Sequence, residues 1–276
     1  MTVRILTQNV EHGAVAQNRW AGLASAISEL QPHLVMLQEV DWLTNRSAIR
    51  AVESDLGMRV IVGKSLHTPN AVAWNPDHLM LRDSYTDWQH DTWHGCCAAT
   101  FDIVGMSLPV PLMAISALLN PNSAWAGAIE AQIIGTKAYR HGGLGLVAGD
   151  INHPALGDEE PDWDAIQPYN RMARCLPRTG PDDPWKANTI VGQTLYSGGF
   201  TDVAAHVAEL RDNPALRRPT GKHGGIRNDQ IHVTPALAPA IADAFRRDTT
   251  AFTDHHLVGA DLDLVKADLT LLRDYT

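Results

Sequence analysis

The segment 146–154, with the sequence LVAGDINHP, constrains this chain more than any other stretch. Its short apolar run is typical of a buried strand, and Gly149 allows the backbone to turn where that run ends. Asp150 and Asn152 lie two positions apart, so an extended backbone would project both side chains to the same side. A carboxylate can take a proton or bind a metal, and a carboxamide can orient a phosphate oxygen or a water molecule. An Asx-turn after a strand would explain the same residues without any catalytic role.

Short apolar runs of this kind recur along the chain and outnumber the segments with helical periodicity. The predicted strands cover residues 3–10, 34–37, 60–62, 71–74, 96–104, 112–118, 146–150 and 229–233, with a further one near residue 257. The predicted helices cover residues 19–30, 46–55, 124–139, 169–175 and 189–196. Many short strands with fewer helices are typical of an α+β sandwich with helices on its outside. The sequence contains no internal repeat and no linker, so we expect a single domain over residues 1–276.

The composition is that of a globular protein with a buried core, since 45% of the residues are hydrophobic. No stretch reaches the roughly 18 apolar residues of a membrane span, and a strand-like run begins at residue 3, so we expect neither a membrane span nor a signal peptide. Three cysteines, of which Cys96 and Cys97 are adjacent, do not make a disulfide framework. We therefore expect a reduced, cytoplasmic protein and a monomer.

The formal net charge of -9 argues against a surface covered by long basic patches for nucleic acid. It does not exclude an enzyme that acts on nucleic acid, because metal-binding carboxylates contribute to the negative charge and a bound cation offsets it locally. The 13 histidines strengthen the expectation of metal binding or proton transfer.

Polar side chains of compatible chemistry follow several of the predicted strands. They are Asn9 with Glu11, Glu39, Asp150 with Asn152, Asp229, and Asp254 with His255. Glu39 follows the apolar run 34–37 after Gln38, at a position where a charge costs free energy unless it is paired or bound to a cation. The alternative for Glu39 is an exposed residue just past the strand.

The order of these motifs resembles the endonuclease/exonuclease/phosphatase superfamily, which includes deoxyribonuclease-I-like and exonuclease-III-like phosphoesterases. The matching segments are QNV at 8–10, LQEV at 37–40, GDIN at 149–152, RNDQI at 227–231 and TDH at 253–255. The match spans residues 9 to 255, nearly the whole chain, and five weak motifs in the right order make a strong combination. The resemblance implies a four-layer α/β/β/α sandwich, in which two mixed β-sheets pack face to face with helices outside. It also implies a divalent cation, Mg2+ or Mn2+, as cofactor.

Carried over to this sequence, the resemblance implies a metal site built from acidic residues. Glu39 would be the main metal ligand, and Asp254 would lie near the same ion. Glu11 stands where some members of the superfamily have an acidic residue that supports the metal. A hard cation with carboxylate ligands fits this set, because it neutralises phosphate charge and helps to generate hydroxide.

The same resemblance implies roles for the residues around the phosphate. Asp150 would activate or position the attacking water, and Asn9 and Asn152 would hold phosphate oxygens. His255 would contact the phosphate, while Asp229 would fix its tautomer and support its positive charge.

One departure from the superfamily pattern concerns the predicted strand 112–118. Many members carry a His in a motif like NTHL there, whereas this chain reads ALLNPN at 117–122. Asn120 or Asn122 would be a replacement donor in substrate binding, and His153 is another compensating candidate. For His153 the alternative is a residue of a surface loop.

Loops at the expected site carry further candidates. Arg227 and His223 flank a glycine-rich segment and would bind substrate phosphate, with a solvated loop as the equal alternative. The Pro-, Asp- and Gly-rich region 158–184 and the region 206–225 are expected to set substrate specificity.

Three functions remain open on this evidence. The first is a divalent-metal-dependent phosphodiester hydrolase, with a DNA endo- or exonuclease preferred and nucleic acid as the partner. The second is a phosphatase or phosphodiesterase for a phosphorylated small molecule or lipid headgroup, which the negative net charge favours. The third is a catalytically silent binding module, supported by the missing His. Retention of Glu39, Asp150, Asp229 and His255 together weighs against the third, because unpaired buried charges are costly.

Overall fold

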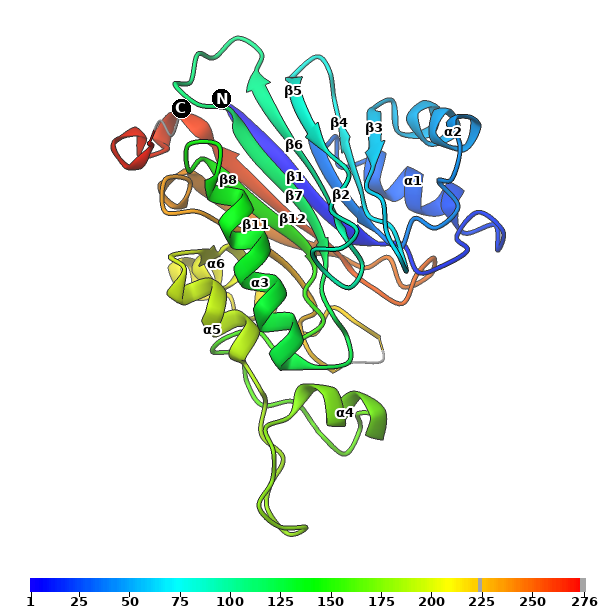
Figure 1. The fold of residues 1–276 in the computed structure, drawn as a ribbon, viewed down its shortest axis with the longest axis vertical. Coiled ribbons are helices and arrows are strands. Elements are labelled where there is room, and N and C mark those ends of the chain that lie inside the picture. Colours follow the sequence, from blue (N-terminus) through cyan, green and yellow to red (C-terminus); the bar gives the residue numbers. More distant parts are fainter. Residues whose placement is uncertain (223–224, 274–276) are drawn as a thin grey trace.

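Two six-stranded sheets pack against each other in the computed structural model, which describes residues 1–222 and 225–273 (Figure 1). In the first sheet, the strands are β1 (Thr2–Asn9), β2 (Leu34–Gln38), β3 (Arg59–Val62), β4 (Ala71–Trp74), β11 (Ile241–Arg247) and β12 (Leu257–Asp263), in the order β11-β12-β1-β2-β4-β3. In the second sheet, they are β5 (Leu79–Tyr85), β6 (Cys96–Ile103), β7 (Leu112–Leu118), β8 (Gly145–Asp150), β9 (Thr201–Asp202) and β10 (Asp229–Val233), in the order β5-β6-β7-β8-β10-β9. Both sheets are mixed, because β1 pairs with β2 and β7 with β8 in parallel while their other pairs are antiparallel.

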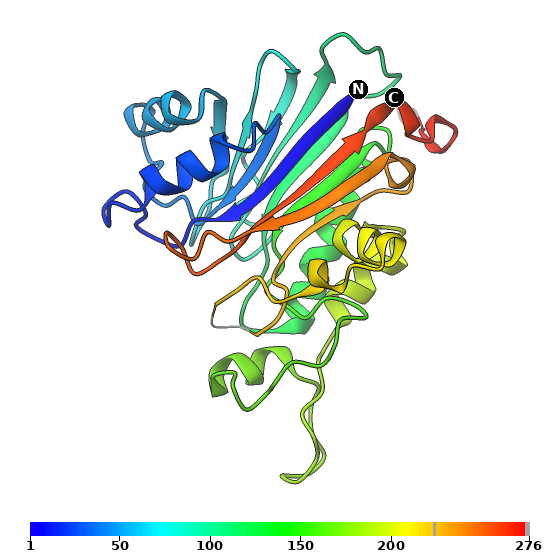
Figure 2. The ribbon, with the colours of Figure 1, turned by 180° about the vertical axis from the view of Figure 1, so that it is seen from behind.

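Helices cover the outer faces of both sheets (Figure 2). Buried side chains of α1 (Trp20–Ser28) and α2 (Arg46–Leu56) pack on the first sheet, and those of α3 (Ala124–Tyr139) and α5 (Ile190–Ser197) pack on the second. α6 (Val203–Arg211) contributes Val203 and Val207 to the core between the sheets. α4 (Pro168–Arg174) belongs to the segment between β8 and α5, which extends from the body of the molecule (Figure 1) and which we call the arm. Short 3-10 helices span Pro214–Arg217, Ala238–Ala240, Leu264–Lys266 and Leu269–Leu271.

Alternating side chains of the central strands produce this layering. In β2, Leu34 and Met36 enter the core between the sheets, whereas Val35 and Leu37 contact the helices outside. The strands are therefore apolar on both faces, as expected when helices and a second sheet cover them. The prediction of a four-layer α/β/β/α sandwich with two mixed sheets is confirmed.

Three strands were not predicted from the sequence, β5, β9 and β11. All three are edge strands. β9 has only two residues, most residues of β5 are exposed, and most residues of β11 are half-buried, so the sequences LMLRDSY and IADAFRR mix apolar and polar residues. An edge strand buries little surface, so its residues carry a weak hydrophobic signal.

The polar ends of five strands meet at one edge of the two sheets. β1, β2 and β8 end there at Asn9, Gln38 and Asp150, and the antiparallel strand β10 starts there, with Asp229 paired to Asp150. β12 also starts at this edge, since it runs antiparallel to β1 with Val258 opposite Thr7. The parallel and antiparallel pairings thus bring together residues from the whole length of the chain.

No helix in residues 1–222 and 225–273 is long and apolar enough to cross a membrane.

The sequence suggested a turn at Gly149, at the end of the apolar run. In the structure Gly149 instead lies inside β8. A Cβ at this position would lie 1.8 Å from the carbonyl oxygen of Ala117 on β7. Glycine is required here because two backbones approach each other closely, and the strand continues through Asp150.

We expect Gly149→Ala to lower the free energy of unfolding by about 3 kcal/mol, because the added methyl group must push β7 and β8 apart. Chemical denaturation would measure the change. Gly180→Ala is the matched control, since nothing lies within 4 Å of a Cβ there. Equal stability of the two variants would contradict the steric argument.

Candidate active site

Asn9 holds two carboxylates that come from different sheets. Its side-chain amide donates to Oε1 of Glu39 at 2.9 Å and to Oδ2 of Asp150 at 3.1 Å. Its Oδ1 accepts a hydrogen bond from the backbone N–H of Glu11 at 2.9 Å. Both amide hydrogens are therefore bound to carboxylates, and neither is left for the phosphate oxygen that the resemblance implied. The structure therefore brings Asn9, Glu39 and Asp150 into one group, as the motifs predicted.

Three residues of this edge adopt the left-handed backbone conformation that glycine normally occupies. Their φ angles are 52° at Glu11, 63° at Glu39 and 63° at Asn152. Such conformations cost free energy in residues with a Cβ and cluster at functional sites. They turn the chain sharply at the ends of β1, β2 and β8, which directs the polar side chains toward one another.

His12 was not recognised in the sequence, although it directly follows the N-x-E motif. Its backbone N–H donates to Oε2 of Glu39 at 3.2 Å, and its ring Nε2 lies 3.1 Å from the same oxygen. The other ring nitrogen lies 3.5 Å from Oδ2 of Asp41. His12 thus supports the Glu39 carboxylate on the side opposite Asn9.

Asp229 and His255 form a buried ion pair. Nδ1 of His255 lies 2.8 Å from Oδ2 of Asp229, and the backbone N–H of Asp229 donates to the hydroxyl of Thr220. Burial by itself lowers the pKa of His255, but the Asp229 carboxylate, helped by Asp150 and Asp254, raises it to about 10. At neutral pH the ring is therefore a cation with Nε2–H as a donor.

The free side of the His255 ring faces the site. Nε2 lies 3.8 Å from Oδ2 of Asp150 and 3.6 Å from Oδ1 of Asp254. Burial raises the pKa of Asp150 to about 6, an effect that His255 opposes and that the Asp229 and Glu39 carboxylates reinforce. Asp150 is thus ionised at neutral pH yet basic enough to take a proton.

Arg174 is a second residue that the sequence did not reveal. It is 5% exposed, and from α4 its Nε donates to the backbone carbonyl of Asn152 at 2.8 Å and its Nη2 to the side-chain Oδ1 at 3.2 Å. Nδ2 of Asn152 donates to the carbonyl of Leu119 at 3.0 Å. Arg174 therefore fixes which way the Asn152 amide points and leaves one Nδ2 hydrogen for a ligand.

Several predicted site residues have other contacts in the structure. Arg227 is buried and forms ion pairs with Asp158 and Asp202 at 2.9 and 2.8 Å, so we withdraw it as a ligand of substrate phosphate. His153 is fully buried, with Nε2 2.8 Å from the carbonyl oxygen of Asn120, so it is neither a surface-loop residue nor a free donor.

Asn120, Glu11 and His223 complete the comparison with the predicted site. Asn120 lies two residues after the end of β7, and its Oδ1 accepts from the backbone N–H of Asn122 at 2.8 Å. Glu11 points to Arg19, with Oε2 3.3 Å from Nη1. His223 lies outside the described residues.

The residues present fit a cation that keeps much of its hydration shell. In residues 1–222 and 225–273, no three His, Cys, Asp or Glu side chains are grouped closely enough to hold a metal by themselves. Mg2+ is usually held by only one or two carboxylates together with water and substrate phosphate. Oε1 of Glu39 has one protein donor, Asn9, and therefore a free lone pair, whereas Oε2 is contacted by both the backbone N–H and the ring of His12. Oδ1 of Asp254 lies 3.6 Å from Nε2 of His255.

No protein-family model and no curated protein sequence matches this chain. Solved structures match over nearly all of it. D. rerio TDP2 complexed with single strand DNA product has a TM-score of 0.61 at 13% identity, covering 94% of this chain and 98% of that chain. An AP endonuclease from Archaeoglobus fulgidus has 0.60 at 15% identity, covering 95% and 99%. An endonuclease/exonuclease/phosphatase family protein from Bacteroides thetaiotaomicron has 0.60 at 12% identity, covering 95% and 97%. The chain therefore has the fold of this superfamily, as its motifs predicted.

His153 should make folding stability depend on pH. Burial lowers its pKa to about 4, below the usual value of 6.5, so between these values the unfolded chain binds a proton that the folded protein excludes. Its contribution is therefore complete above pH 6.5 and is lost as the pH falls toward 4, by about 3 kcal/mol in total.

Denaturation of the wild type and His153→Gln between pH 7 and 4 would measure this loss. The difference between the two free energies of unfolding should shrink as the pH falls. His90→Gln serves as the control, because His90 is exposed. A constant difference between wild type and His153→Gln across this range would contradict the assignment.

Proposed function

We propose that this protein is a divalent-metal-dependent phosphodiester hydrolase whose preferred substrate is DNA. The proposal rests above all on one observation, the approach of Asp150 to both Asn9 and His255 at the meeting edge of the two sheets. A base, a cationic donor and a metal-binding carboxylate within one small region are what hydrolysis of a phosphodiester requires. The fold shared with an AP endonuclease and with a TDP2 complexed with single strand DNA product supports this class of substrate.

In the proposed reaction, Asp150 positions the attacking water and takes its proton as the oxygen bonds to phosphorus. The bond from phosphorus to the leaving oxygen breaks in the same displacement. His255 donates from Nε2 to a phosphate oxygen, and Asp229 keeps the ring charged and in place. Asn152, oriented by Arg174, donates the second hydrogen of its amide to the phosphate.

Mg2+ or Mn2+, when bound, would neutralise phosphate charge and help to generate hydroxide. Glu39 would hold the ion with Asp254, and His12 and Asn9 would orient the Glu39 carboxylate. Glu11 would support the metal only after leaving Arg19. Asn120 remains the proposed replacement for the histidine that many superfamily members carry in the region of β7.

The net charge of -9 favours a second candidate, a phosphatase or phosphodiesterase for a small phosphorylated molecule or lipid headgroup. A catalytically silent module is the weakest candidate. Burying Asp150 and the Asp229–His255 pair costs free energy, and a silent module would have no catalytic use for these charges.

We expect His255→Ala to lower kcat by about 10²–10⁴ in hydrolysis of DNA, because the cationic donor to the phosphate is lost. Asp229→Asn should have a smaller effect, since it removes only the support of the ring. His256→Ala is the control, because the ring of this neighbouring histidine lies next to Asp248, with Nδ1 3.6 Å from its Oδ1. Near-normal turnover by His255→Ala would refute the assignment of the site.

We expect Glu39→Gln to raise the Mg2+ concentration needed for half-maximal activity, because a neutral amide attracts the cation less strongly than a carboxylate. Asp77→Asn, which removes the charge of an exposed side chain, is the comparison variant. Hydrolysis should be measured on supercoiled plasmid, single-stranded DNA, an abasic-site duplex, RNA and small phosphate esters, with Mg2+ and with EDTA. Turnover of small esters alone would favour the second candidate.

A further inference from the structure

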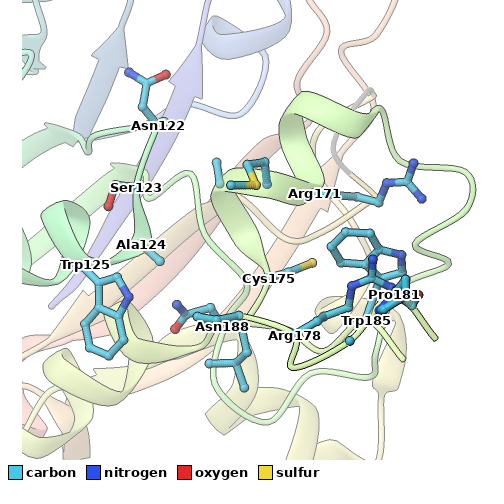
Figure 3. A pocket seen from close by; sticks show the side chains of 15 residues that line it. Asn122, Ser123, Ala124, Trp125, Arg171, Cys175, Arg178, Pro181, Trp185 and Asn188 are labelled. Carbon is cyan, nitrogen blue, oxygen red and sulfur yellow. Dashed lines mark hydrogen bonds between the residues drawn. The ribbon is translucent and has the colours of Figure 1, made fainter. Parts of the chain in front are cut away.

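A groove of about 560 Å³ lies between the start of α3 and the arm that carries α4 (Figure 3). We call it the arm groove and define it by Asn122, Trp125, Arg171, Arg178 and Trp185, which line it with their neighbours. Trp125 lies on one side, and Arg171, Arg178 and Trp185 lie on the other (Figure 3). The volume is that of a site for a small molecule or one part of a larger one.

The arm groove is joined to the candidate active site by direct contacts. Asn122 lines the groove, and its backbone N–H donates to Oδ1 of Asn120 after β7. On the arm, Ala173 and Cys175 line the groove, while Arg174 between them donates to Asn152. A chain-like substrate held by Asp150 and Asn152 would therefore meet the arm groove next.

The charge of the arm groove differs from that of the protein as a whole. The chain has a formal net charge of -9, yet no Asp or Glu is among the described residues that line this groove, and two arginines are. Arg178 is committed to the arm itself, since its Nη1 donates to the carbonyl oxygens of Pro181 and Asp183 at 2.9 Å. A local surface of this kind is what a polyanion needs to approach an acidic protein.

Arg171 has unused hydrogen-bonding capacity. Its ion pair with Asp164 is long, at 3.6 Å, and the Asp164 side chain is 94% exposed. Its Nε is buried and has no hydrogen-bond partner among the described residues. The guanidinium lies 5.2 Å from the centre of the Trp185 ring, which holds it at the groove wall.

Trp125 is a large apolar ring left open to solvent. It is 59% exposed on the first turn of α3, and Met172 on the opposite side is 83% exposed. An exposed tryptophan across a groove from a cationic arginine matches the way proteins bind unpaired nucleotides, whose bases stack on aromatic rings while cations contact the phosphates. In a duplex the bases are already stacked on each other, so the ring would find no free base face.

We propose that the arm groove binds an unpaired stretch of the nucleic-acid substrate, with Trp125 stacking on a base and Arg171 contacting a phosphate. The inference rests on the proposed function, because it names the form of the substrate, single-stranded over double-stranded. It assigns the arm a role in specificity and not in the chemical step.

The test has two measurements: binding of an oligonucleotide under conditions that prevent hydrolysis, and hydrolysis of a small ester that does not need the arm groove. Fluorescence anisotropy with a labelled oligodeoxythymidine in EDTA would measure binding, and hydrolysis of bis(4-nitrophenyl) phosphate with Mg2+ would measure chemistry on a substrate too small to reach the groove. The variants are Trp125→Ala and Arg171→Ala, with Trp125→Phe to retain an aromatic ring. The controls are Tyr196→Ala, an exposed aromatic residue on α5, and Arg82→Ala, whose ion pair with Asp102 is also 3.6 Å long.

We expect the Kd for the oligonucleotide to rise about tenfold in Trp125→Ala and Arg171→Ala, and to be largely retained in Trp125→Phe and both controls. The kcat/KM for the small ester should be unchanged in all of them. Equal Kd values for wild type and groove variants, or equally tight binding of duplex DNA, would overturn the inference.

Failure of the proposed function has a different signature. A wild type that hydrolyses neither substrate but binds the oligonucleotide through Trp125 would refute the enzyme and leave the groove as a binding site. A wild type that hydrolyses both, with groove variants unaltered, would refute the groove alone. Sedimentation of each variant adds one further outcome, because a dimer lost in Trp125→Ala would show that the groove binds a second copy, which would also overturn the inference.

Discussion

The hydrogen bonds of the Asn9 amide join the two sheets at the edge where the candidate chemistry is placed. One serves Glu39, which follows β2 of the first sheet, and the other serves Asp150, at the end of β8 of the second. A second link lies nearby in the core, where Nε2 of Gln38 donates to the hydroxyl of Ser116 at 3.0 Å. Two carboxylates repel each other, and a shared hydrogen-bond donor offsets part of this repulsion.

Burial sets the protonation of the groups around this link. The core of apolar side chains between the sheets removes water from Asp150, Asp229 and His255, and each charge then depends on its neighbours. The Asp229 carboxylate raises the pKa of His255 strongly, while burial raises the pKa of Asp150 to about 6. The same packing therefore supplies a cationic donor and a weak base within 3.8 Å of each other.

The arm connects this edge to the outer surface. Arg174 is buried against Asn152, whereas Met172 on the same helix is exposed, so α4 presents one side to the candidate site and another to solvent. A displacement of Arg174 would thus be felt at Asn152, whose amide it orients. In the proposals made above, the chemical step lies at the edge of the sheets and the selection of substrate lies on the arm.

The sequence by itself determined the layers and the polar residues that end the central strands. Apolar runs such as residues 34–37 specify a strand that is buried on both faces, and the polar residues that end these runs follow from local order along the chain. The sequence did not reveal the edge strands β5, β9 and β11, which are too short or bury too little to carry a pattern. Only the tertiary structure decided which distant side chains meet. Asn9 and Asp150 are 141 positions apart, Arg174 reaches Asn152 from a separate arm, and Arg227 turned inward to Asp158 and Asp202 instead of to a ligand. Such contacts depend on the packing of whole elements, which no local pattern of residues records.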